Sequence, residues 1–146
     1  MIVADTSALI SLTAADTLDL LLEEFDIHTT ETVIEELEDL ASYEDDTAEH
    51  ADKVLNQKDQ ITIHEVDTPE YQSSRVDEGE GSCIQLTRNI DADFLITDDL
   101  RALPELQTLT ETRIAISPIV LKALVERGAL AREEVLERLD DAAEER

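Results

Sequence analysis

Short apolar runs alternate with longer amphipathic segments along this chain. The runs are brief and bounded by polar or acidic residues, as expected for short strands, several of them buried in a sheet. Strands are predicted at five places: 1–4, 26–29, 61–66, 94–96 and 113–116. Because helical segments separate the strands, the pattern predicts an α/β fold, a three-layer α/β/α sandwich around a central, mostly parallel sheet.

The intervening segments carry apolar residues at helical spacing. Helices are predicted after Asp5, at 17–25, from Thr30 to about Leu40, at 43–58, 80–90, 99–106, 117–127 and 131–144. The segment 43–58 is expected to be an exposed amphipathic helix, and 67–79 a loop. Thr30 is a typical N-cap, Pro118 suits a first helical turn, and Gly128 is expected to end a helix. Residues 1–140 are therefore predicted to form one domain, with a frayed end at 141–146.

Composition indicates the cellular compartment and excludes several classes of protein. With 146 residues, 42% of them hydrophobic but only 3% aromatic, the chain can form one aliphatic core. A single cysteine, Cys83, cannot form an internal disulfide, which fits a reducing compartment. No apolar run of membrane-spanning length and no signal peptide occur, so a cytoplasmic protein without membrane contacts is expected.

The charge is extreme: 37 acidic residues face 11 basic ones, for a net charge of −26. Such a surface should repel nucleic acids in dilute salt. At roughly 1 M salt the Debye length shrinks to about 3 Å, and distant charges no longer interact. The composition resembles that of cytosolic proteins from extreme halophiles, so the acidity describes the solvent more than the partner.

Acidic residues follow two of the predicted strands. Asp5 ends the first strand, and Asp98 and Asp99 follow Phe94–Thr97. In open parallel sheets, ligands bind at the carboxyl edge. We therefore expect these acids to meet at one edge. Glu36 and Glu80, on predicted helices, could reach the same crevice.

A shared cation would explain such a cluster, because carboxylates brought together repel one another otherwise. Mg²⁺ and Mn²⁺ prefer oxygen ligands and bind through one or two carboxylates, waters and substrate phosphate. Such an ion activates water for attack on phosphorus, and a second one can stabilise the leaving oxygen. The three histidines, His28, His50 and His64, are expected to lie scattered. Taken singly, each acid could equally be a helix cap or a solvated surface residue.

The arrangement resembles the PIN-domain family of metal-dependent ribonucleases. The segments that carry the resemblance are IVADTSALI, VIEEL, DEGEGSCIQL and FLITDDLRA. The resemblance implies a PIN-like α/β/α sandwich, an acidic pocket for Mg²⁺ or Mn²⁺, and endonucleolytic cleavage of RNA. It also implies Asp5, Glu36, Glu80 and Asp99 as catalytic residues and metal ligands, and Asp98 as a further metal ligand or a neighbour of one. Thr97 is expected in a supporting place, and Thr6 or Ser7 could cap the first helix and also hold a metal-bound water.

Several assignments within this set stay open. Asp77 is an alternative to Glu80, and Asp98 and Asp99 cannot be ordered. Glu35 is an alternative to Glu36, because neighbouring helix positions point about 100° apart and only one can face the pocket.

Many small PIN domains resemble VapC toxins, which implies an antitoxin partner and a homodimer besides the RNA substrate. Arg88 and Arg101 are candidate RNA contacts, and Arg75 is a further one, although each could be a surface ion-pair partner. A receiver domain would need a lysine where Ser117 precedes Pro118, and a haloacid-dehalogenase-like phosphatase a second aspartate where Ser7 stands. The remaining alternative is a non-catalytic PIN-like module that binds RNA or protein.

Overall fold

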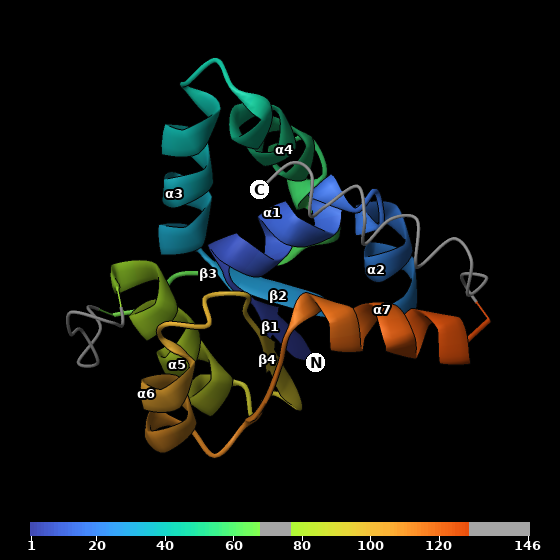
Figure 1. Cartoon of the computed structure of the whole chain (residues 1–146). Coiled ribbons are helices and arrows are strands. Elements are labelled where there is room, and N and C mark those ends of the chain that lie inside the picture. The colour runs from blue at the N-terminus through green and yellow to red at the C-terminus, as the bar shows by residue number, and fades with distance from the viewer. Residues whose placement is uncertain (68–76, 129–146) are drawn as a thin grey trace.

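Five parallel strands form the centre of the protein, as seen in a computed structural model that describes residues 1–67 and 77–128 (Figure 1). The strands are β1 (Ile2–Ala4), β2 (Ile27–Thr30), β3 (Thr62–His64), β4 (Phe94–Ile96) and β5 (Arg113–Ala115). Their order is β3-β2-β1-β4-β5, and every pairing is parallel. The sequence prediction of an α/β/α sandwich is confirmed, and β1 and β4 are neighbours at its centre.

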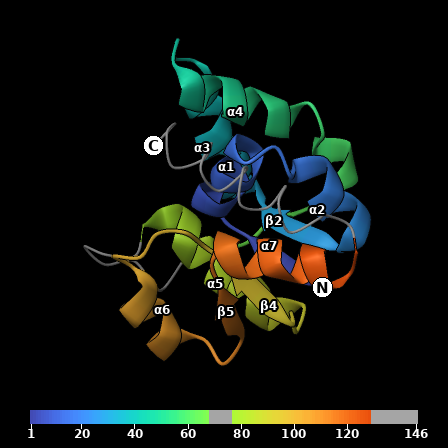
Figure 2. The same ribbon diagram turned by 45° about the vertical axis from the view of Figure 1, so that its right-hand side comes forward.

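Helices cover both faces of the sheet. They are α1 (Thr6–Ala14), α2 (Leu18–Glu24), α3 (Glu31–Ala41), α4 (Asp46–Leu55), α5 (Glu78–Asn89), α6 (Leu103–Leu109) and α7 (Ser117–Glu126), with a short 3₁₀ turn at Lys58–Gln60. In Figures 1 and 2, α5 and α6 lie on one side of the sheet, while α1 to α4 lie on the other. Helix α7 packs against α1 and α2. Helices α3 and α5 contact each other across the carboxyl end of the strands.

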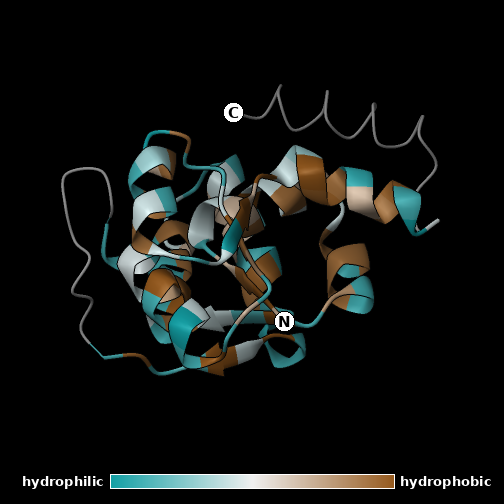
Figure 3. Cartoon of the chain, turned by 90° about the horizontal axis from the view of Figure 1, so that it is seen from below, coloured by the Kyte–Doolittle hydropathy of each residue, from teal (hydrophilic) through white to brown (hydrophobic). Residues whose placement is uncertain are grey.

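An aliphatic core holds these layers together. Val3, Leu95 and Ile96, on the two central strands, are almost completely buried, and the inward sides of the surrounding helices pack on them. Figure 3 shows the helices with hydrophobic and hydrophilic residues on different sides. A smaller cluster of Ile84, Ala102 and Leu106 joins α5 to α6. Burial of this aliphatic surface supplies the main driving force for folding, as expected for a chain with few aromatic residues.

Local signals in the sequence set the ends of several helices. The Thr30 side chain accepts a hydrogen bond from the Val33 amide at 3.1 Å and so caps α3, as predicted. Gly128, just after α7, has a φ of +75°, a conformation that glycine adopts without strain.

Three helix predictions need correction. Helix α5 begins at Glu78, earlier than the predicted residue 80, because Asp77 and Glu80 form a capping box around its first turn. Helix α6 begins at Leu103 and not at Asp99, because the Asp99 side chain holds the preceding residues in a turn. Helix α4 is not merely an exposed helix: it packs on α1 and α3, and Ala51 is fully buried in that contact.

Some predictions fall outside the described residues. These are the larger part of the loop at 67–79, the last helix at 131–144 and the frayed end at 141–146. Within the described chain, no helix has both the length and the apolar character needed to cross a membrane.

Candidate metal centre

A cavity of about 410 Å³ opens at the carboxyl end of β1 and β4. Most of the residues that line it carry a carboxylate or a hydroxyl, and Ile10 of α1 and Leu40 of α3 add apolar side chains. The lining residues are Asp5, Thr6, Ser7, Ile10, Ser11, Glu36, Leu40, Asp77, Glu80, Asp98 and Asp99. None of these described lining residues is a lysine, arginine or histidine. The cavity therefore concentrates negative charge without a lining cation to balance it.

Asp5 lies at the floor of this cavity, directly after β1. Its backbone amide continues the pairing with β4 by donating to the Ile96 carbonyl at 3.1 Å. Its carboxylate caps α1 by accepting from the Ala8 amide, and accepts from the Ser7 hydroxyl, both at 2.9 Å. Only 3% of the residue is exposed. Burial raises the pKa of Asp5 to about 6, although hydrogen bonds from Thr97, Ala8 and Ser7 oppose that rise.

Ser7 and Thr97 connect the two central strand ends. The Ser7 hydroxyl donates to Asp5, accepts from the Asp98 amide at 2.9 Å, and lies 3.3 Å from the Thr97 hydroxyl. Thr97 in turn accepts from the Asp99 amide at 3.2 Å. The possibility that Thr6 or Ser7 caps α1 is not realised, because Asp5 takes that role. Both hydroxyl residues instead bond to acidic residues of the cavity or to their backbone.

Asp98 and Asp99 both line the cavity, but their carboxylates have different partners. Asp98 accepts a hydrogen bond from the Ser117 amide at 2.7 Å and another from the Ser117 hydroxyl, so it holds the start of α7. Asp99 accepts from the amides of Arg101 and Ala102, at 3.1 and 3.3 Å. The strand-end acids are thus fixed by bonds to neighbouring backbone.

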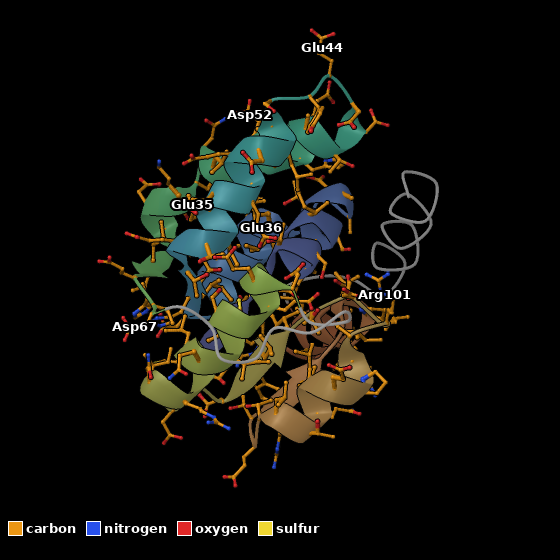
Figure 4. All side chains as sticks on the ribbon, turned by 90° about the vertical axis from the view of Figure 1, so that its left-hand side faces the viewer. Glu35, Glu36, Glu44, Asp52, Asp67 and Arg101 are labelled. Atoms are coloured by element: carbon orange, nitrogen blue, oxygen red, sulfur yellow. The ribbon has the colours of Figure 1, made fainter. Side chains whose placement is uncertain are left out.

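Glu36, on α3, approaches the cavity from the side. Figure 4 shows it facing the first turn of α5, whereas Glu35 points away from that turn. Glu35 is exposed and lines a different hollow. The Thr6 hydroxyl donates to the Glu36 carboxylate at 3.0 Å. Burial, followed by the negative charge of Asp77, raises the pKa of Glu36 to about 7.

Asp77 and Glu80 both reach the cavity from the start of α5. The Asp77 carboxylate accepts from the Glu80 amide at 2.8 Å, and the Glu80 carboxylate accepts from the Asp77 amide at 3.2 Å. Glu80 is 6% exposed. Burial and a hydrogen bond with Asp99 raise the pKa of Glu80 to about 9, while that same bond lowers the pKa of Asp99. The opposite shifts of the two pKa values favour a proton held on Glu80 and shared with the Asp99 carboxylate.

Comparison with known proteins identifies this arrangement. A family model with the description PIN domain matches residues 1–144. The chain belongs to the PIN-domain family. PIN domains are generally nucleases and typically use divalent metals. A search of curated protein sequences gave no match.

The donor chemistry of this PIN domain suits a hard divalent cation. Every charged group lining the cavity is a carboxylate, and the raised pKa values of Asp5, Glu36 and Glu80 record repulsion and desolvation that a cation would relieve. Within residues 1–67 and 77–128, no three acidic, histidine or cysteine side chains are arranged to hold an ion by themselves. Mg²⁺ binds through one or two carboxylates and takes its other ligands from water and substrate phosphate, so it does not require such a group.

The two arginines named as candidate RNA contacts lie in different places. Arg88 is exposed, donates to the Leu109 carbonyl at 2.9 Å and lines a pocket of its own, away from the acidic cavity of the PIN domain. Arg101 is exposed in the turn after β4, directly after the Asp99 region (Figure 4). Of these two, Arg101 alone is close to the acids. Arg75, also considered from sequence, lies outside the described residues.

Sequence reasoning missed two residues at the site and one contact away from it. Ser117 binds Asp98, which could have been anticipated, because Ser117 follows β5 and β5 pairs with β4. Gly79 was expected in a loop, yet it lies in α5 beside Glu36. The histidines are not all scattered: His28 and His64, on paired strands, bond through ring nitrogens 2.9 Å apart.

Proposed function

We propose that this PIN domain is a metal-dependent endoribonuclease that hydrolyses RNA phosphodiester bonds with Mg²⁺ or Mn²⁺. The observation that carries the proposal is the convergence of carboxylates from β1, α3, α5 and the end of β4 on one cavity without a lining cation. Bringing the acids together costs stability, because like charges held together disfavour the ionised forms. A bound cation would offset this repulsion and would explain why the carboxylates lie together.

The acids of the cavity have two kinds of role in this proposal. Asp5, Glu36, Glu80 and Asp99 would hold the metal, and Asp98 would keep the β4 end in place through Ser117. When bound, the metal lowers the pKa of a water molecule and neutralises charge on the phosphate. Thr6, Ser7 and Thr97 orient carboxylates or their backbone. Glu80 must release its proton before it can act as a ligand, since metals bind the deprotonated group.

The net charge of −26 sets a condition on this activity. RNA approaches such a surface only when salt screens the repulsion, and a halophilic origin would provide that salt. We therefore expect cleavage in molar KCl and little cleavage in dilute buffer. Cleavage that is fastest in dilute buffer would contradict the halophilic part of the proposal.

The proposal is tested by incubating a mixed RNA pool with the protein in molar KCl, with Mn²⁺ or with chelator. Wild type should give new RNA fragments when Mn²⁺ is present and none in chelator. The control Glu35→Ala should behave in the same way, because the Glu35 side chain is exposed outside the cavity. Asp5→Asn should give none. The nuclease proposal is wrong if wild type and Asp5→Asn leave the same products.

A second candidate is a PIN-like module that binds RNA or protein without cleaving. The observation that favours it is that no three potential ligand side chains in the described residues form a ready metal site. The same RNA assay separates the two candidates: a mobility shift with intact RNA, unchanged by Mn²⁺, would support the module.

Biological context extends the proposal further. A cytoplasmic toxin that forms a homodimer and pairs with an antitoxin fits a small PIN domain. A short neighbouring gene for a DNA-binding protein would support the pairing. Growth arrest on expression, relieved by that neighbour, would test it directly; unimpaired growth would contradict toxicity.

A further inference from the structure

The first turn of α5 passes unusually close to Glu36 on α3. A Cβ atom added to Gly79 would lie 1.7 Å from Oε1 of Glu36, 2.7 Å from its Cδ and 3.0 Å from Oε2. These distances are too short for any side chain at position 79 unless the Glu36 carboxylate moves. The Glu36 carboxylate therefore occupies the space that a side chain at position 79 would fill.

A chain of buried hydroxyls fixes the approach of the two helices. The Val33 amide donates to the Thr30 hydroxyl at 3.1 Å, and the Ser82 hydroxyl donates to the Gly79 carbonyl at 2.7 Å. The hydroxyls of Thr30 and Ser82 lie 2.7 Å apart. Since the Ser82 proton is used by Gly79, the bond between the two hydroxyls takes its proton from Thr30. Both residues are fully buried, so this chain ties the α3 cap to the turn that contains Gly79.

Helix propensity gives no reason for glycine at this position. Glycine is among the poorest helix formers, and alanine among the best. Gly79 is nevertheless buried inside the first turn of α5, with Asp77 and Glu80 forming the capping box around it. A close contact that excludes Cβ is the remaining physical reason, and the contact is with a carboxylate of the cavity.

We propose that Gly79 is a positioning residue, which places the Glu36 carboxylate at the metal site by leaving room for it against α5. This inference rests on the proposed function, because it assigns Glu36 to a metal. Gly79 touches neither substrate nor ion. A methyl group at position 79 would push the flexible end of Glu36 aside and leave the remaining acids in place.

The test is a double-mutant cycle of wild type, Gly79→Ala, Glu36→Ala and the double variant, each titrated with Mn²⁺ in molar KCl. Gly79→Ala should weaken Mn²⁺ binding roughly 10- to 100-fold, as loss of an orienting partner does in other metal sites. In the Glu36→Ala background the same change should have no further effect on binding. RNA cleavage, measured on the same four proteins, should follow binding.

Thermal unfolding without metal is the second readout. In the Glu36→Ala background, Gly79→Ala should raise Tm, because the clash is gone and alanine favours the helix. If Gly79→Ala alone does not fold, the double variant should fold. Failure of both variants to fold would show that something other than Glu36 excludes the side chain, and would overturn the inference.

Other outcomes are equally distinct. Wild-type Mn²⁺ affinity in Gly79→Ala, or additive losses in the double variant, would overturn the role of Gly79 while leaving the nuclease proposal intact. Wild type that neither binds Mn²⁺ nor cleaves RNA would instead overturn the proposed function itself.

Discussion

The acids at the strand ends and the acids on the helices reach the same cavity in different ways. Asp5 and Asp99 accept hydrogen bonds from backbone amides that follow them in the chain, and Asp98 accepts one from the amide of Ser117, the first residue of α7. Glu36 accepts a hydrogen bond from the Thr6 hydroxyl of α1, and Glu80 accepts one from the amide of Asp77, the N-cap residue of α5. The strand-end acids therefore hold the fold as well as the site, whereas Glu36 contributes mainly to the site.

This difference separates stability from activity in an experiment. Removing a strand-end acid deprives backbone amides of an acceptor, and at Asp5 the Ala8 amide concerned is buried, which destabilises the protein independently of any metal. Removing the charge of Glu36 relieves repulsion and leaves every backbone amide satisfied. Variants of the two groups should therefore diverge in Tm even where they agree in loss of cleavage.

Asp5 should show the largest effect, in both properties. Asp5→Asn and Asp5→Ala should each lower cleavage more than about 100-fold, beyond what loss of an outer partner costs. Asparagine can still cap α1, whereas alanine should cost about 1 kcal/mol more in stability. Cleavage rates and urea unfolding, measured side by side, would check both effects. Equal stability of the two variants would contradict the capping role.

Glu36→Gln should separate the two properties most clearly. Cleavage should fall roughly 10- to 100-fold, while Tm in chelator stays constant or rises, since Glu36 has a raised pKa and its charge is disfavoured in the folded state. Glu35→Ala, one residue away on the exposed side, is the matched control and should change neither quantity. A lower Tm with unimpaired cleavage would reverse the assignment.

Stability of the metal-free protein should fall as pH rises. Asp5, Glu36 and Glu80 have pKa values raised to about 6, 7 and 9, so the folded state holds protons that the unfolded chain releases. Their contribution is complete below pH 4 and is lost by about pH 9, a change on the order of a few kcal/mol. The lowered pKa of Asp99 opposes this in part at the acid end.

Saturating Mn²⁺ should flatten that pH dependence, because the ion binds the charged carboxylates. Unfolding curves between pH 4 and 9, with Mn²⁺ and with chelator, provide the comparison. Parallel curves under the two conditions would mean that the buried acids do not bind the ion.

Ser117 should show the smallest effect. Ser117→Ala removes one hydrogen bond to Asp98 and keeps the bond from the Ser117 amide, so the expected loss is about 1 kcal/mol of stability. Ser117→Thr keeps the hydroxyl and is the control. Mn²⁺ affinity should change much less than in Glu36→Gln. A loss of affinity as large as that of Glu36→Gln would make Ser117 part of the metal site.

The sequence predicted the site best where an acidic residue directly follows a strand. Asp5 and Asp98 could be brought to one edge from the apolar runs alone, since parallel strands end together. The prediction was incomplete for the helices. The choice between Glu35 and Glu36 depends on the rotation of α3 about its axis. That rotation follows from how α3 packs on α4, α5 and α1, which periodicity does not specify.

Gly79 shows the same limit more sharply. Glycine near a predicted loop is the expected punctuation of a turn. Only the three-dimensional approach of Glu36 shows that the space was needed inside a helix. Likewise, His28 and His64 meet because β2 pairs with β3 in one register, which their separation in sequence does not show.

A crystal grown in high salt and soaked in Mn²⁺ tests the central claim most directly. The anomalous signal of manganese should lie in the cavity between Asp5 and Asp99, with the Glu36 carboxylate facing it. Manganese found elsewhere on this acidic surface, with the cavity filled by water alone, would contradict the account.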